Sequence, residues 1–143
     1  MKILYFHQYF STPKGAGGTR SYLLAKKLVN SGHKVKMVCL NDVRSDSGIN
    51  KPFVNGKRIG YVDDIEVWEL NIRYSNKRNF YKRIFIFFIY CWKSIKIALE
   101  EEVDLIVATS TPLTVGIPGI VAYFLKKTPL VFEVRDLWPE LPK

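Results

Sequence analysis

Short apolar runs alternate along the chain with segments whose apolar residues recur every three or four positions. Ile3–Phe6 is the first apolar run, and Val35–Leu40 (VKMVCL) is the second. Continuously apolar runs of this length are typical of parallel strands that are buried on both faces of a sheet. The intervening helical pattern begins after Thr19, which we expect to cap it, and ends at Ser31-Gly32. Its expected core positions are Tyr22, Leu23, Leu24, Ala25, Leu28 and Val29.

The middle of the chain predicts a hairpin and then a long helix. Two β-rich runs, Arg58–Val62 and Ile65–Leu70, flank the dipeptide Asp63-Asp64, which has the length of a two-residue hairpin turn. Residues 41–56 are rich in Asn, Asp, Ser, Gly and Pro, and this composition predicts a surface loop. The helix is expected from about Asn79 to residue 99.

The last third repeats the strand and helix alternation. Asp104–Ala108 and Leu130–Val134 are the expected strands, and a helix should run from Thr111-Pro112 to Lys127 with a break near Pro118. The opening strand, helix and strand predict a right-handed parallel crossover. The whole order predicts one α/β domain over residues 1–143, with a doubly wound, mainly parallel, Rossmann-like sheet.

Charge and cysteine content narrow the classes of partner and compartment. The 143 residues carry 22 Lys and Arg against 13 Asp and Glu, and the resulting charge of +9 favours anionic partners. No zinc spacing, helix-turn-helix pattern or RNA-recognition signature is present, so we expect no nucleic-acid partner. The two separated cysteines, Cys39 and Cys91, fit a reducing cytosol and have no metal-ligand spacing. The longest apolar run, Ile84–Trp92, is far shorter than the roughly 20 residues of a membrane span.

Ligands of open α/β sheets bind at the carboxyl ends of the strands. Three segments leave such ends here, residues 7–18, 109–112 and 135–143, and all three should lie near one another. The first segment begins with His7, which belongs to the same crevice. The last follows a strand whose end gathers charges beside Trp138: Glu133, Arg135, Asp136 and Glu140. An ordinary Arg135-Asp136 ion pair is the simpler interpretation, but four charges at one strand end look more like a site.

A glycine-rich entry precedes the first helix. Gly15, Gly17 and Gly18 permit close backbone approach, and the exposed N–H groups of a helix N-terminus attract anions. Thr19 and Arg20 follow, and the Arg20 guanidinium would add a contact to phosphate or carboxylate. A flexible loop without a ligand is the alternative interpretation. Dinucleotide binding is a weaker one, because Arg20 replaces the third glycine of GxGxxG, where a small residue is needed for helix and strand to pack.

A basic and aromatic stretch occupies residues 73–96 and contains no acidic residue. Such a helix can lie in a membrane interface, where cations contact headgroups and rings enter the acyl boundary. A core helix is the alternative, because residues 84–92 are apolar all round. We expect a helix that is half buried and half membrane-facing. The candidate membrane-surface residues are Lys77, Arg78, Lys82, Arg83, Phe87 and Trp92.

Four segments together resemble the N-terminal half of family 4 glycosyltransferases of the GT-B fold. The likeness is strongest to the L-fucosamine and colanic-acid type of bacterial surface-polysaccharide transferases. The resemblance covers nearly the whole chain and lies in four segments: KILYFHQYF, GAGGTRSYLLAKKLVNSGHKVKMV, ATSTPLTVGIPG and VFEVRDLWPE. The last two segments are the more specific to this family. The resemblance implies a hexosyltransferase, retaining in mechanism, whose N-terminal half receives the acceptor while the C-terminal half holds the nucleotide-sugar donor.

The resemblance also implies roles for individual residues. Gly17 and Gly18 would face the donor diphosphate or an acceptor phosphate, while Ser110 and Thr111 would line the acceptor side. Arg135 and Asp136 would stand where many relatives have a His-Asp pair near the reacting sugar. Arginine cannot act as a base, so a role inferred from that histidine does not transfer. His7 and Glu140 join the acceptor-side residues by their place in the same crevice.

The implied acceptor is a polyprenyl-diphosphate-linked saccharide at the inner face of the cytoplasmic membrane, used in capsule, O-antigen or exopolysaccharide synthesis. We expect no cofactor and no metal, with the nucleotide-sugar acting as a substrate. A complete relative would continue into a second domain with a Glu-x₇-Glu motif, which does not occur by Lys143. We therefore expect an acceptor-binding half that is inactive alone. The alternatives are a membrane-docking subunit of a split enzyme and a dinucleotide-binding protein.

Overall fold

One mixed sheet of six strands organises the chain in the computed structural model, which describes residues 1–42, 45–74, 80–110 and 112–135. Along the sheet the strands have the order β3-β4-β2-β1-β5-β6. The elements follow one another along the chain as β1 (Lys2–Phe6), α1 (Arg20–Asn30), β2 (Lys34–Asp42), β3 (Lys57–Val62), β4 (Ile65–Tyr74), α2 (Phe80–Glu100), β5 (Leu105–Thr109), the 3₁₀ turn η1 (Leu113–Gly116), α3 (Ile117–Lys126) and β6 (Leu130–Glu133).

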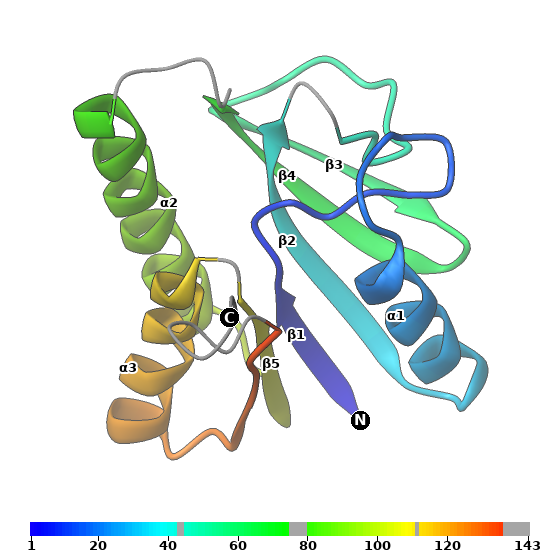
Figure 1. Ribbon diagram of the computed structural model, residues 1–143. Helices are drawn as coiled ribbons and strands as arrows, with labels where there is room; N and C mark the ends of the chain where they lie inside the picture. Colours follow the sequence, from blue (N-terminus) through cyan, green and yellow to red (C-terminus); the bar gives the residue numbers. More distant parts are fainter. Residues whose placement is uncertain (43–44, 75–79, 111, 136–143) are drawn as a thin grey trace, which may run out of the picture.

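The sheet is parallel except at one edge. β1 lies in the middle and pairs in parallel with β2 and β5, β6 pairs with β5, and β4 pairs with β2. Among the six described strands, only β3 is antiparallel, against β4. Helix α1 covers one face of the sheet, and α2 and α3 cover the other (Figure 1). The prediction of a doubly wound, Rossmann-like α/β fold is confirmed.

The apolar runs form strands with two buried faces. In β1, Leu4 and Phe6 pack in the core cluster beneath α2 and α3, whereas Ile3 and Tyr5 pack in the cluster beneath α1. Successive side chains of a strand point to opposite faces, so a strand covered on both sides must be apolar at every position. This explains why these strands show no alternation of polar and apolar residues.

Helix α1 has a narrower buried face than the sequence predicts. Tyr22 and Ala25 are buried as expected, but Leu23 is 58% exposed and Leu24 is 39% exposed, so their assignment to the core was wrong. The helical repeat places residues 22, 25, 28 and 29 against the sheet and turns 23 and 24 toward solvent. Thr19 does precede the helix, but its side chain makes no capping hydrogen bond.

The predicted turn and helix break are both present. Asp63 and Asp64 have φ angles of 47° and 62°, as the two central residues of a type I′ hairpin turn require. Strand β4 continues past Leu70, the expected end, to Tyr74. The 3₁₀ turn η1 separates Pro112 from α3, and Pro118 lies in the first turn of that helix, where its missing N–H breaks no helical bond.

Candidate functional site

Three strand ends meet at one edge of the sheet. β1, β5 and β6 are parallel neighbours, so the segments that follow them emerge side by side (Figure 1). The backbone N–H of Ser110 donates to the carbonyl oxygen of Glu133 at 3.0 Å, and the Ser110 hydroxyl accepts from the backbone N–H of Arg135 at 2.8 Å. On the other side, the Arg135 guanidinium lies 3.8 Å from the position that a Cβ would occupy on Gly18. The predicted convergence of the three segments is therefore confirmed for their described residues.

A chain of polar side chains crosses these strand ends. The Tyr5 hydroxyl lies 2.9 Å from the Thr109 hydroxyl, and Thr109 donates in turn to Glu133 Oε2 at 2.8 Å. The second carboxylate oxygen of Glu133 pairs with Arg20 Nη2 at 2.7 Å. We call Tyr5, Thr109, Glu133 and Arg20 the polar chain. It ties β1, β5 and the edge strand β6 to the first residue of α1.

The polar chain contains both buried and accessible groups. Tyr5 and Thr109 are fully buried, and burial raises the pKa of the Tyr5 phenol, which therefore remains a donor at neutral pH. The Glu133 side chain is 20% exposed, whereas the Arg20 side chain is 66% exposed. The Arg20 guanidinium can therefore hold Glu133 and still present other N–H groups to an anion, because guanidinium has five donors in a fixed fork.

His7 lies beneath this edge as a neutral group. It is buried, and its Nδ1 shares a hydrogen bond of 2.6 Å with the hydroxyl of Ser21, which is also buried, in the first turn of α1. Burial lowers the pKa of His7 to about 3, and the positive charge of Arg135 contributes to the decrease. This hydrogen bond joins His7 to the first turn of α1, and the predicted acceptor contact of His7 remains a prediction. We therefore assign His7 to positioning the start of α1.

The glycines of the first loop differ in what surrounds them. A Cβ on Gly15 would lie 2.2 Å from Ser11 Oγ and 2.6 Å from the backbone nitrogen of Asp46, and one on Gly17 would lie 3.0 Å from Ser11 Cβ. Close packing inside the loop and against Asp46 accounts for these two glycines, and their predicted phosphate contact remains a prediction. Gly18 instead faces Arg135, so it belongs with the strand-end group.

Some of the other predicted site residues have described positions, and the rest lie outside the described residues. Ser110 is buried, and its hydroxyl is engaged by Arg135, whereas Lys82 and Trp92 are exposed on α2 and Arg83 is half-buried. Phe87, predicted for the membrane surface, is half-buried and packs against the core cluster beneath α2. The remaining predicted residues lie outside the described residues: Lys77, Arg78, Thr111, Asp136 and Glu140.

Sequence patterns single out Arg20 and Glu133 of the polar chain but not Tyr5 or Thr109 individually. Tyr5 lies in an apolar run that predicts core, Thr109 is only the first residue of the strand-end segment 109–112, and Glu133 is one of four charges at a strand end. A signal was nevertheless present, because residues two apart on a strand share a face and both Thr109 and Glu133 end otherwise apolar strands. Pairing Thr109 with Glu133, however, requires the register of β5 against β6, which the sequence does not reveal.

No protein-family model matches the chain, and a comparison with curated proteins also finds no match. Within residues 1–42, 45–74, 80–110 and 112–135, no group of three or more His, Cys, Asp and Glu side chains is placed to hold a metal ion. Function is therefore inferred from the strand-end geometry and from the segments that resemble family 4 glycosyltransferases.

Proposed function

We propose that this chain is the acceptor-binding half of a glycosyltransferase that moves a sugar from a nucleotide-sugar to a polyprenyl-diphosphate-linked saccharide. The observation that supports it most directly is the pair of guanidinium groups, from Arg20 and Arg135, at the carboxyl edge of the sheet beside Gly18. Two cations near a helix N-terminus and close to exposed backbone suit a diphosphate. The resemblance supplies the class of reaction.

Each group at this edge would have a distinct part in acceptor binding. Arg20 and Arg135 would contact the diphosphate, since guanidinium binds phosphate oxygens through paired N–H donors. Glu133 holds Arg20 in place through the ion pair at 2.7 Å, and Thr109 fixes the Glu133 carboxylate in turn. Neither arginine can remove a proton, because guanidinium remains protonated. Arg135 therefore acts as a charge that stabilises phosphate, not as the base that relatives with histidine at this position would contain.

Sugar transfer breaks the bond from the sugar C1 to the nucleotide diphosphate and forms one from C1 to an acceptor hydroxyl, which loses its proton. The groups described here serve the acceptor side of that exchange. The donor would be held mainly by a second domain, in the same chain or in a partner. We place the activity at the inner face of the cytoplasmic membrane, in surface-polysaccharide synthesis, because that is where lipid-linked acceptors of this class lie.

Acceptor binding can be measured without membranes. The ligand is a water-soluble, short-chain prenyl diphosphate that carries one sugar, and isothermal titration gives its Kd. Arg20→Ala and Arg135→Ala should each weaken binding about 10- to 100-fold, the usual effect of losing a charge-assisted phosphate contact. Lys27→Ala removes an exposed cation from the far end of α1 and should leave the Kd unchanged.

The result that would overturn the proposal is equally direct. If the chain shows no binding of the prenyl diphosphate sugar but binds NAD tightly, the site is a dinucleotide site. If Arg20→Ala and Arg135→Ala both bind the acceptor like the wild type, the arginine pair is not the diphosphate site.

A further inference from the structure

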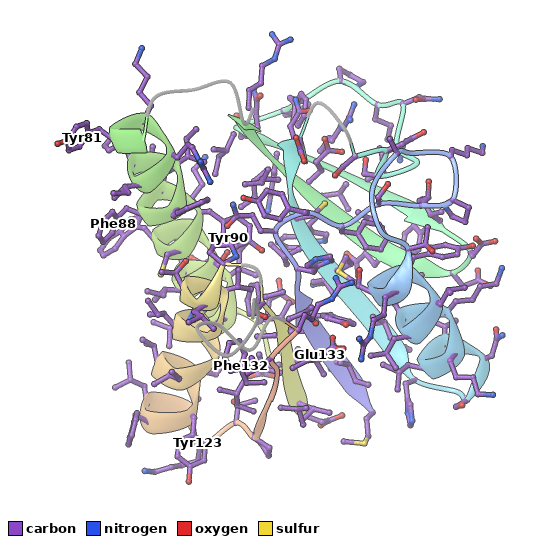
Figure 2. All side chains as sticks on the ribbon, in the orientation of Figure 1. Tyr81, Phe88, Tyr90, Tyr123, Phe132 and Glu133 are labelled. Atoms are coloured by element: carbon purple, nitrogen blue, oxygen red, sulfur yellow. The ribbon has the colours of Figure 1, made fainter. Side chains whose placement is uncertain are left out.

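The outer face of α2 carries a stripe of exposed aromatic residues. Tyr81, Phe85, Phe88 and Trp92 are between 65% and 77% exposed, and their spacing of three or four residues places them on one side of the helix. Figure 2 shows Tyr81 and Phe88 pointing away from the sheet and Tyr90 pointing toward it. The buried side of α2 therefore closes the core, while the rings of this aromatic stripe are mostly exposed.

Helix α3 and the turn before it extend the apolar surface. The two helices pack side by side on the same face of the sheet (Figure 1). Leu113, Ile117, Ile120 and Phe124 are between 39% and 65% exposed and repeat at the same intervals as the aromatic stripe. Together the two rows form what we call the α2–α3 face. Exposed apolar surface that continues across two helices is unusual for a monomer and marks an interaction site.

An apolar groove runs between the two helices. It has a volume of about 250 Å³ and is lined by Ile84, Phe87, Phe88, Cys91, Thr114 and Ile117. Five of these six side chains are apolar, and Thr114 is the exception. A groove of this chemistry suits a hydrocarbon chain, and it opens on the face that carries the aromatic stripe.

Positive charge flanks the stripe on the side away from the groove. The helical repeat places Lys82, Lys93 and Lys96 along this flank, and no acidic residue occurs from Phe80 to Leu99. Lys93 reaches the turn at Gly56, so the flank continues onto the turn before β3. Lys96 has a partner in Glu100 at 3.7 Å, but both side chains are exposed and the pair is weak. The face therefore combines an apolar centre with a basic border.

We propose that the α2–α3 face docks on the surface of an anionic phospholipid bilayer, with the aromatic stripe in the acyl boundary and an acyl chain in the groove. The basic border matches anionic headgroups, and aromatic rings beside lysines are the chemistry of an interfacial helix. The proposal concerns contact with the membrane surface, and none of the described helices is long and apolar enough to span a membrane. Pairing with a second copy is disfavoured, since it would bring two lysine borders into one interface.

This docking is independent of the sugar-transfer proposal, and its test uses vesicles that contain no acceptor. The full chain is sedimented with vesicles of phosphatidylcholine and phosphatidylglycerol, and separately with vesicles of phosphatidylcholine alone. We expect strong binding to the anionic vesicles that falls with added salt. Lys82→Glu with Lys96→Glu should weaken it at least about 25-fold, because each lysine near an anionic leaflet contributes about fivefold. Lys27→Glu with Lys34→Glu makes the same charge change beyond this face and should have a far smaller effect.

A second pair of variants tests the aromatic stripe. Phe85→Ser with Phe88→Ser alters exposed side chains, so folding should survive, which circular dichroism can verify. This variant should lose most vesicle binding, and Trp92 should show fluorescence quenching by brominated lipid in the wild type but not in the variant. The proposal is overturned if anionic vesicles do not bind the wild type, or if the serine variant binds them equally. If the wild type forms a dimer and does not bind vesicles, and the serine variant is a monomer, the face is an interface with a second copy.

Discussion

Replacing His7 should abolish a specific pH dependence of stability. The His7 imidazole is buried against Ser21, and its pKa falls from an ordinary 6.5 to about 3 in the folded chain. Between these two values the unfolded chain binds a proton at this position that the folded chain does not. The free energy of unfolding must therefore decrease as the pH falls from 6.5 toward 3.

The magnitude follows from the two pKa values. Below pH 6.5 each pH unit costs about 1.4 kcal/mol, so the free energy of unfolding should fall by about 2 kcal/mol between pH 7.5 and pH 5. This interval avoids most carboxylate titration, since free Asp and Glu titrate near pH 4. His7→Gln keeps a polar group beside Ser21 but has no proton to gain, so its stability should change little over the same interval.

Urea unfolding at a series of pH values, followed by circular dichroism, measures this difference. His33→Gln is the matched control because it removes the other histidine, which lies in the turn before β2, and it should retain the wild-type pH dependence. The reasoning is refuted if His7→Gln loses stability as steeply as the wild type. An NMR titration gives an independent check, because the His7 ring signals should not move until the pH is well below 5.

Three further substitutions test other parts of the fold. Thr109→Val removes the acceptor of the buried Tyr5 hydroxyl and should lower the free energy of unfolding, measured in urea, by about 1–3 kcal/mol. Adding Tyr5→Phe should recover part of that loss. If the losses of the two single variants simply add in the double variant, the two hydroxyls do not interact. Gly48→Ala should cost about 2 kcal/mol, because φ is 79° there and the new Cβ would lie 2.8 Å from Val62 Cγ2; an unchanged melting temperature would contradict this. Asp64→Gly should stabilise the hairpin by up to about 1 kcal/mol, since φ is 62°, and a lower melting temperature would count against the turn assignment.

The sheet was predictable because its signals are local. Continuous apolar runs such as Ile3–Phe6 predict two-sided burial, and the dipeptide Asp63-Asp64 predicts the turn from its length alone. The buried face of α1 was less predictable, because four consecutive apolar residues, 22 to 25, allow more than one helical face. Burial of Ser21 against His7 selects the observed face, and that contact joins residues 14 positions apart.

The sequence predicts where the candidate site lies but not which side chains pair within it. The carboxyl-end rule locates the edge where Gly18, Ser110 and Arg135 meet, because parallel strands bring their ends together whatever their side chains. The partners within that edge depend on strand register, which places Thr109 beside Glu133 and leaves Arg20 within reach of the same carboxylate. Sequence patterns record which residues are polar, but the pairing is set by tertiary contacts.

The strand-end site and the α2–α3 face should act together on a lipid-linked acceptor. Helix α2 follows β4 and η1 follows β5, so the α2–α3 face begins at the carboxyl edge of the sheet, whereas Arg20 begins α1 on the opposite face. A domain resting on the α2–α3 face would therefore hold the strand-end site at this edge, one sheet layer away from the bilayer. A diphosphate anchored in the same membrane then meets the arginines at a high effective concentration, because docking makes the second contact intramolecular. Phe85→Ser with Phe88→Ser should therefore weaken binding to a long-chain prenyl diphosphate sugar in vesicles at least about 100-fold, the lower range of such avidity effects. The same variant should bind the soluble short-chain compound like the wild type, and an equal loss for both compounds would mean that the stripe supports the arginine site itself rather than the membrane contact.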